Sequence, residues 1–279
     1  MGIGEVGEWL RRSTVHIRAN GPKQSAGSGV IWDKDGTIVT NAHVIGNGTY
    51  SAELWDGRSF PLELKAKDEQ KDLARLRVAA TGLPSTVLRK QAVRPGELVV
   101  AVGNPLGFTG ALTTGVVHAA GPFPGLGRRA WVQAAIRLAP GNSGGPLADA
   151  AGQLIGINTM IVAGGIALAI PSATVDEFVR RGAGPRLGVT IRTVRLSRRN
   201  RIGLLILSID HDGSAAQASL LPGDILVGTQ KSTFTAASDL VDAIAEASGR
   251  LKMRFLRGDH TREREVVISL PVQPTREAA

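Results

Sequence analysis

Three polar residues, far apart in the chain, have the types needed for nucleophilic catalysis. Ser143 stands in the phrase G-N-S-G-G-P, His43 ends an apolar run in T-N-A-H-V, and Asp72 opens the run D-L-A-R-L-R-V. A serine hydroxyl becomes a nucleophile when a neighbouring base takes its proton, and a carboxylate can hold an imidazole base in the required tautomer. The three residues together could therefore form a catalytic triad.

Each of the three residues also has an ordinary explanation. Gly, Asn, Ser and Pro are the usual residues of surface turns, so 141–146 could be a simple turn. A single histidine at the end of a strand is often structural, and aspartate commonly begins a strand. The search for a base is nevertheless short, because the only histidines are at positions 16, 43, 118, 211 and 260.

The chain order His43, Asp72, Ser143 separates two possible scaffolds. Triads built on two β-barrels have this order. The phrase G-N-S-G-G also fits the G-x-S-x-G elbow of α/β-hydrolases, but that elbow needs a helix after the serine and places the acid and histidine downstream. Here P-L-A-D-A-A-G-Q-L-I-G-I follows, which predicts a turn and a strand. The order and the local pattern favour the two-barrel scaffold.

Composition points to a protein of many short strands and turns. The chain has 279 residues, 43% of them hydrophobic, which is enough for two domains with real cores. Glycine is abundant at 35 residues and aromatics make up only 4%. Cysteine is absent, which excludes disulfides, thiolate catalysis and cysteine-bound zinc. No His/Asp/Glu group has the spacing of metal ligands, so we expect no metal and no cofactor.

The charge and hydropathy patterns bear on partners and location. The net charge is +9, but the basic residues are scattered and few aromatics lie among them, so a solvated basic surface is favoured over specific nucleic-acid binding. No apolar run is long enough to span a membrane. The start M-G-I-G-E-V-G-E-W-L-R-R lacks the features of a signal peptide. As written, the sequence predicts a cytoplasmic protein; a true start further upstream would allow the cell envelope.

The pattern along the chain predicts two β-rich domains. Residues 13–170 read as strands and turns, with hairpin signals at Asp35-Gly36 and Asp56-Gly57. A helix follows in P-S-A-T-V-D-E-F-V-R-R, where Thr174 and Glu177 have the spacing of a capping box. After the linker R-G-A-G-P at 181–185, a small β-rich module with one helix near 238–248 begins. We therefore expect a mainly β protein with domains at 1–181 and 186–272 and a tail at 273–279.

Five motifs, in their order, resemble those of one family. T-N-A-H-V, D-L-A, V-A-V-G-N-P-L-G, G-N-S-G-G-P-L and A-I-P-S are similar to motifs of the HtrA (DegP-like) trypsin-fold serine proteases with a C-terminal PDZ domain. The resemblance covers nearly the whole chain. It implies a chymotrypsin-like double β-barrel protease domain followed by a PDZ domain, with His43 as general base, Asp72 as its orienter and Ser143 as nucleophile.

The resemblance also implies a substrate class and an assembly. Members of that family are ATP-independent endopeptidases that degrade unfolded proteins, as in protein quality control, and they usually assemble from trimers. We accordingly expect unfolded proteins or peptides as substrates and a homotrimer or a multiple of trimers. The second functional class that stays open is a latent or inactive protease that acts as a chaperone or peptide-binding protein.

The reaction chemistry of a serine nucleophile explains why glycine is frequent around Ser143. They let backbone N–H groups converge on one point, so those of Gly141 and Ser143 should form an oxyanion hole with Asn142 between them. Zymogen-type proteases carry an aspartate at the position of Asn142 that pairs with a newly cut N-terminus. Activation by propeptide cleavage is therefore not expected here, and a loop rearrangement is the family-like alternative.

The specificity pocket is where the chain departs most from the resemblance. Arg137 lies six residues before Ser143, where trypsin-like enzymes place the floor of the pocket. If this segment is extended, Arg137 faces away and Leu138 lines the pocket, with Leu168 replacing a common Phe in the strand expected to line the cleft. That arrangement predicts cleavage after Val, Ala, Leu or Ile. If Arg137 pointed inward, it would select Asp or Glu.

The second domain carries a possible peptide-binding loop. Arg186, Leu187, Gly188 and Val189 resemble the PDZ loop that receives a C-terminal carboxylate while the peptide adds a strand to a sheet edge. Gln230-Lys231 stands where an Asn-Gly pair is usual, so that turn must differ. The alternative is that this module only packs against the protease domain and contacts neighbours.

Overall fold

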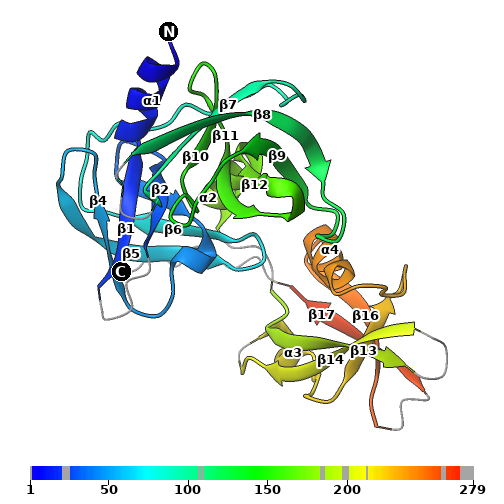
Figure 1. Cartoon of the computed structure of the whole chain (residues 1–279). Coiled ribbons are helices and arrows are strands. Elements are labelled where there is room, and N and C mark those ends of the chain that lie inside the picture. Colours follow the sequence, from blue (N-terminus) through cyan, green and yellow to red (C-terminus); the bar gives the residue numbers. More distant parts are fainter. Residues whose placement is uncertain are drawn as a thin grey trace. The chain divides into compact units, whose positions relative to one another are not determined.

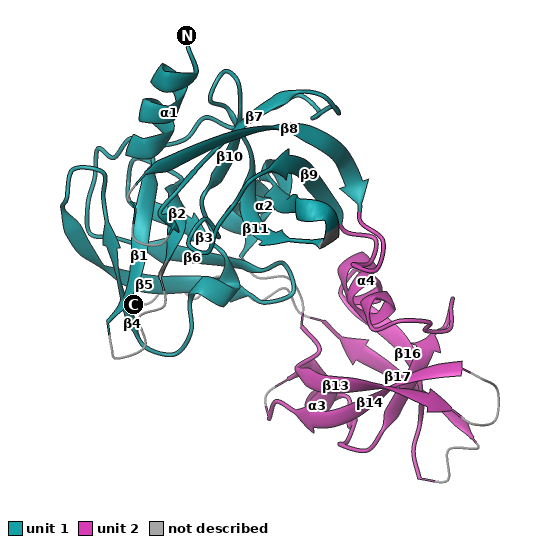
Figure 2. Cartoon of the chain, in the orientation of Figure 1, with its two compact units in different colours: residues 1–122, 130–183, 274–279 teal, residues 123–129, 184–273 magenta. Residues whose placement is uncertain are grey.

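The structure is a computed structural model that describes residues 2–20, 26–105, 108, 110–182, 186–196, 201–211, 213–258 and 262–270. The chain divides into two compact units (Figure 2), of which unit 1 holds residues 1–122, 130–183 and 274–279 and unit 2 holds residues 123–129 and 184–273. The predicted tail at 273–279 and most of the predicted linker at 181–185 lie outside the described residues.

The first half of unit 1 is a closed barrel, barrel 1, with the strand order β1-β2-β3-β6-β5-β4. Its strands are β1 (Thr14–Asn20), β2 (Ala26–Ile31), β3 (Thr37–Thr40), β4 (Thr49–Glu53), β5 (Ser59–Asp68) and β6 (Leu73–Arg77). Inward-facing side chains such as Ile17, Ile38 and Leu76 fill the interior. The hairpin predicted at Asp35-Gly36 is confirmed, because Gly36 has φ +99° between the antiparallel strands β2 and β3.

The second half of unit 1 is another closed barrel, barrel 2, with the order β10-β11-β12-β9-β8-β7 (Figure 1). Its strands are β7 (Leu98–Gly103), β8 (Ala111–Pro122), β9 (Ala130–Ile136), β10 (Pro146–Asp149), β11 (Leu154–Ile161) and β12 (Ile166–Pro171). The predicted double β-barrel is thus confirmed. The segment after Ser143 forms strand β10 and not a helix, which excludes the hydrolase elbow.

Unit 1 also contains two α-helices among its described residues. Helix α1 (Ile3–Arg12), which the sequence pattern did not predict, packs Val6 and Leu10 against Val100 and Val102 of β7. Helix α2 (Ser172–Arg181) buries Val175 and Phe178.

The predicted capping box at Thr174 is wrong. Helix α2 already begins at Ser172 after Pro171, so Thr174 lies inside its first turn and makes no capping bond there. Proline has a fixed φ that suits a helix start, and this local preference sets the boundary.

Unit 2 contains a five-stranded sheet in the order β13-β14-β15-β16-β17. Its strands are β13 (Val189–Leu196), β14 (Arg201–Ile209), β15 (Ile225–Thr229), β16 (Arg250–Leu256) and β17 (Glu263–Ser269), with helices α3 (Ser214–Gln217) and α4 (Ser238–Glu246). Leu204, Phe234, Ile244 and Met253 form its core. The helix predicted near 238–248 is confirmed, with its end two residues earlier.

Within the part of the chain that the structure describes, no helix is long and apolar enough to cross a membrane.

Candidate active site

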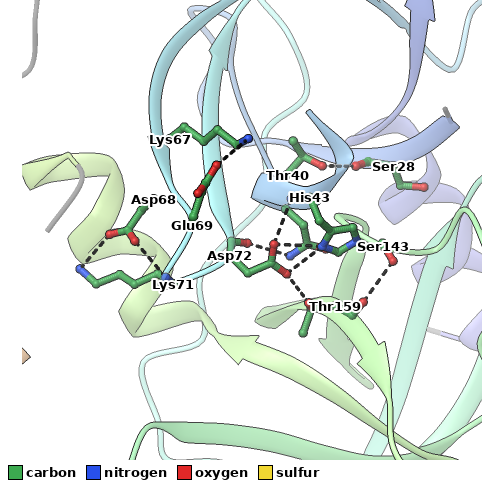
Figure 3. Close-up of polar contacts among 11 residues, drawn as sticks. Ser28, Thr40, His43, Lys67, Asp68, Glu69, Lys71, Asp72, Ser143 and Thr159 are labelled. Carbon is green, nitrogen blue, oxygen red and sulfur yellow. Dashed lines mark hydrogen bonds and ion pairs between the residues drawn. The ribbon is translucent and has the colours of Figure 1, made fainter. Parts of the chain in front are cut away.

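His43 and Asp72 form a hydrogen-bonded pair on barrel 1 (Figure 3). His43 lies in a short 3-10 turn, η1 (Ala42–Val44), directly after β3. Its Nδ1 atom lies 2.9 and 3.0 Å from the two carboxylate oxygens of Asp72, and its backbone N–H donates to Asp72 Oδ1 at 3.1 Å. Two bonds to one carboxylate fix both the position and the ring orientation of His43.

The backbone of Asp72 adopts a conformation that few residues tolerate. Its φ is +54°, in the left-handed region, where aspartate is more frequent than most side chains. The side chain of Asn41 donates to the Asp72 carbonyl at 3.1 Å and so helps to hold this conformation. The arrangement turns the Asp72 carboxylate toward His43 just before β6 begins.

The electrostatics keep Asp72 ionised. Burial raises the pKa of the Asp72 carboxyl, but hydrogen bonds from His43 and Thr159 lower it by more, so its pKa lies below the ordinary value. When His43 is neutral, an ionised Asp72 accepts from Nδ1–H and leaves Nε2 as the free acceptor nitrogen. That nitrogen is the one a general base would use.

Thr159 of β11 links the acid to the candidate nucleophile. Its hydroxyl donates to Asp72 Oδ2 at 2.5 Å, and its carbonyl accepts a bond from Ser143 Oγ at 3.1 Å. Sequence analysis missed this residue because its segment reads simply as a buried strand. The available signal was the polar pair Asn158-Thr159 inside an otherwise apolar run.

Ser143 lies beside the His43 ring, as Figure 3 shows, but its hydroxyl rests on Thr159. Among the described residues, no hydrogen bond joins Ser143 Oγ to His43 Nε2. A rotation about χ1 of Ser143 is needed to bring the hydroxyl to the imidazole. Such bonds are often long or absent in substrate-free enzymes and form when substrate binds.

The loop before Ser143 contains a tight turn. Asn142 N–H donates to the Ala139 carbonyl at 3.0 Å, and Gly141, the third residue of this turn, has φ +104°. A positive φ at the third position is the mark of a type II turn. Within the described residues, the N–H groups of Gly141 and Ser143 donate to no acceptor. Two unpaired donors therefore flank the paired N–H of Asn142.

A cavity of about 200 Å³ adjoins Ser143. Its other lining residues are uncharged: Leu138, Ala139, Pro140, Asn142, Asn158, Thr159, Met160 and Ile161. Leu138 lines this cavity, whereas Arg137 is exposed and lies outside it. Leu168 is fully buried in β12, paired with Gln133 of β9, and does not line the cavity either.

The predicted peptide-binding loop lies at the start of β13 in unit 2. The carbonyls of Leu187 and Gly188 accept backbone bonds from Ala215 and Asp210, both at 2.9 Å, and Gly188 has φ +71°. Leu187 is buried, Arg186 is exposed and Val189 begins the edge strand β13. These bonds give the loop a defined shape at the start of β13, which is the outermost strand of the described sheet.

The turn at Gln230-Lys231 replaces the usual Asn-Gly pair by a side-chain contact. The hydroxyl of Thr229 accepts bonds from the N–H groups of Lys231 and Ser232, at 3.1 and 3.2 Å. A threonine hydroxyl can organise a turn in this way without a glycine in the left-handed region.

Comparisons with known proteins agree with the two barrels and the site. The family model described as Trypsin-like peptidase domain matches residues 27–157. Serine protease HTRA2, mitochondrial, of Drosophila pseudoobscura pseudoobscura is 35% identical over 271 residues, covering 84% of this chain and 64% of that protein. Serine protease HTRA1 of Xenopus tropicalis is 34% identical over 296 residues, covering 92% of this chain and 64% of that protein.

Solved structures point the same way. The HtrA-type protease AlgW with decapeptide superposes with a TM-score of 0.66 at 25% identity, covering 98% of this chain and 99% of that one. A serine endoprotease from Yersinia pestis superposes with a TM-score of 0.67 at 28% identity, covering 97% of each chain. Over most of its length the chain is therefore similar to HtrA-type serine proteases. It spans 64% of the length of the curated relatives named above.

Proposed function

We propose that the chain is a serine endopeptidase of HtrA type, with Ser143 as nucleophile, His43 as general base and Asp72 as the residue that orients His43. The observation that carries this proposal is the placement of His43 Nδ1 at 2.9 and 3.0 Å from both oxygens of an ionised carboxylate, with Ser143 beside the ring. An imidazole held in this way can take a serine proton at neutral pH once the Ser143 hydroxyl rotates toward Nε2.

The reaction follows from the positions of these groups. Ser143 Oγ leaves the Thr159 carbonyl, gives its proton to His43 Nε2 and attacks the peptide carbonyl carbon. The resulting oxyanion accepts bonds from the unpaired N–H groups of Gly141 and Ser143, which cost no reorganisation at that moment. His43 then protonates the leaving amine, and water attacks the acyl-enzyme by the same route in reverse.

The cavity beside Ser143 supports a preference for small or medium apolar side chains before the cut bond. It has about 200 Å³ of space and no charged lining residue. An acidic side chain would lose its hydration there without gaining a cationic partner, which is unfavourable. Val, Ala, Leu and Ile satisfy both the volume and the polarity of the cavity.

The substrate class and the assembly come from the family. Unfolded proteins or peptides are the substrates that we propose, since an extended chain can reach a nucleophile at the cleft surface, and a trimer or multiple of trimers is the proposed assembly. The alternative, a latent protease that acts as a chaperone, gains no support from the relatives, which are named as serine proteases.

We further propose that unit 2 is a PDZ domain that binds peptide C-termini. The supporting features are the shaped loop at Leu187-Gly188 and the edge strand β13 that starts at Val189. A peptide could add its strand there while its carboxylate meets the loop. Binding measured for an apolar peptide with a free C-terminus, but not for its amidated form, tests this role; equal binding of both contradicts it.

The main test is digestion of unfolded casein with and without a serine-directed phosphonate. We expect casein fragments from the untreated protein, none after treatment, and a phosphonate adduct on the peptide that contains Ser143. Mass spectrometry of the fragments maps the cut sites. Digestion that persists after full labelling of Ser143 would contradict the proposed mechanism.

A further inference from the structure

A single buried hydroxyl on barrel 1 reaches the loop that carries Ser143. Ser28 belongs to β2, and its Oγ donates to the carbonyl of Gly141 at 2.7 Å. Its backbone N–H donates to the carbonyl of Ser143 at 2.9 Å. Ser28 therefore contacts the main chain on both sides of Asn142, across the boundary between the two barrels (Figure 3 shows Ser28 close to the site).

The Ser28 hydroxyl also accepts two bonds from Asn104, the residue that follows β7. The backbone N–H of Asn104 donates at 2.9 Å and its side-chain amide at 3.3 Å. A serine hydroxyl has one donor and two acceptor positions, so all three are used. Ser28 is fully buried, so bulk solvent does not replace its hydroxyl, and these three hydrogen bonds depend on the side chain of Ser28 itself.

Asn104 extends the connection to neighbouring segments. Its side-chain amide donates to the Val15 carbonyl in β1 at 3.0 Å, and its Oδ1 accepts from Gly110 N–H at 2.9 Å. The Gly141 carbonyl is thus tied, through one hydroxyl, to β1, β2 and the segment after β7.

Close packing leaves the loop little room to adjust around this bond. A Cβ atom on Gly141 would lie 2.6 Å from the carbonyl oxygen of Asn104, and one on Gly144 would collide with the Ser28 carbonyl and the Thr40 hydroxyl. Thr40 itself donates to the Ser28 carbonyl at 2.7 Å. Backbone approaches this close need glycine.

The turn at 139–142 can exist in two forms that differ in one peptide plane. Types I and II differ by a rotation of about 180° of the central peptide, here the one between Pro140 and Gly141. The form in the structure has Gly141 at φ +104° and an unpaired Gly141 N–H. Reversal of that peptide would turn the N–H away. The bond from Ser28 to the Gly141 carbonyl acts on the next peptide, between Gly141 and Asn142, and so fixes the position of the Gly141 Cα atom to which this N–H is attached through one bond.

We propose that Ser28 is a positioning residue of the protease, whose hydroxyl holds the Gly141 carbonyl and so places the main chain of Gly141, with its N–H, within reach of the developing oxyanion. The inference rests on the proposed function. Ser28 does not contact the substrate; it acts through the Gly141 peptide. Its loss should therefore weaken binding of the transition state and leave binding of the substrate ground state nearly unchanged.

The test compares Ser28→Ala with Ser13→Ala, a matched control. Ser13 is also fully buried in unit 1, and its hydroxyl donates one bond, to the Leu10 carbonyl at 3.0 Å, away from the site. On a peptide substrate, Ser28→Ala should lower kcat by about 10- to 100-fold with KM within about threefold, less than the roughly 10²- to 10³-fold cost of losing an oxyanion donor. Ser13→Ala should retain wild-type kcat at a comparable thermal stability.

A peptide aldehyde gives a second readout that a purely structural role would not move. It adds to Ser143 to form a tetrahedral adduct with an oxygen at the oxyanion position, so its affinity should fall by the same factor as kcat/KM in Ser28→Ala. Ser28→Cys keeps a weaker donor and should lie between wild type and Ser28→Ala in both measurements.

The outcomes separate this inference from the proposed function. Wild-type cleavage that Ser143→Ala abolishes supports the proposed function; if Ser28→Ala then keeps kcat within twofold, only the role of Ser28 is overturned. Failure of both Ser28 variants to fold would assign Ser28 to the fold alone and also overturn it. Cleavage that survives in Ser143→Ala would contradict the proposed function and, with it, this inference.

Discussion

Barrel 1 and barrel 2 contribute to the candidate active site by different chemical means. Barrel 1 presents side chains: the His43 ring and the Asp72 carboxylate, joined at 2.9 and 3.0 Å. Barrel 2 presents Ser143 and, around it, main-chain groups: the N–H groups of Gly141 and Ser143 and the carbonyl of Thr159. Side-chain chemistry depends on residue type, whereas main-chain chemistry depends on φ and ψ. Substitutions in the two barrels should therefore fail in different ways.

The largest expected effect falls on the pair that spans the two barrels. Ser143→Ala and His43→Ala should each lower kcat for peptide hydrolysis by on the order of 10⁵ to 10⁶, because neither residue activates the reaction without the other. The double variant should be no slower than either single one. Steady-state kinetics on one peptide substrate measure this. If the fold-losses in kcat of the two single variants multiplied in the double variant, the two residues would act independently, which would contradict the triad.

Asp72→Asn tests the side-chain contribution of barrel 1 alone. The amide can keep the shape of the site, but it removes the anionic acceptor that fixes the His43 tautomer, so kcat should fall by about 10⁴. KM should change little. Retention of more than a tenth of wild-type kcat would mean that Asp72 only holds the fold, and thermal unfolding measured in parallel would reveal such a role.

Gly141→Ala tests the main-chain contribution of barrel 2. The new Cβ atom meets the Asn104 carbonyl oxygen at 2.6 Å and disfavours φ +104°, so the turn must shift. Loss of one oxyanion donor costs about 10² to 10³ in kcat. Gly57→Ala is a control that also places a side chain at a positive φ, +82°, but in open space on barrel 1. It should destabilise the fold and leave kcat of the folded protein unchanged.

Thr159→Val tests the contact between the two barrels through the pH dependence of the stability of the fold. Burial raises the pKa of Asp72, and bonds from His43 and Thr159 lower it by more, so removal of the Thr159 hydroxyl should raise this pKa. A carboxyl with a lowered folded-state pKa stabilises the fold above its unfolded-state pKa, and that contribution is lost as pH falls through the folded value. The variant should therefore lose stability at higher pH than wild type. Urea unfolding between about pH 2 and 6 measures the shift.

The smallest effect is expected at Arg137, the exposed residue of the segment before Ser143. Arg137→Ala should leave kcat/KM within about twofold, as for most surface substitutions, with an unchanged set of cut sites in casein. Leu138→Ala, which enlarges the cavity, should instead shift the cut sites toward larger apolar residues. A wild-type preference for Asp or Glu that Arg137→Ala abolishes would identify Arg137 as the selector.

The same contrast explains what could be predicted from the sequence. Alternating apolar runs and hairpin turns predict a β-rich chain, the resemblance to the HtrA family implies the double barrel, and His43, Asp72 and Ser143 stand out by type and order. The contact between Ser28 and Asn104 could not be predicted, although Asn104 lies in the motif V-A-V-G-N-P-L-G, because only folding brings the two residues within 2.9 Å. Helix α1 was missed because its short apolar face, with Val6 and Leu10, is stabilised by packing against β7, a contact that the local sequence does not show.

The resting position of Ser143 has a consequence for the populations of the free enzyme. In the proposed mechanism its hydroxyl must pass from the Thr159 carbonyl to His43 Nε2 by a side-chain rotation, a motion far faster than the turnover of most enzymes. Only the molecules with the hydroxyl on His43 can react, so the fraction in that rotamer multiplies the rate with every electrophile. Substrates and phosphonates that do not contact Thr159 are slowed by one common factor. A ligand whose own donor takes the Thr159 carbonyl would release the serine and raise that fraction.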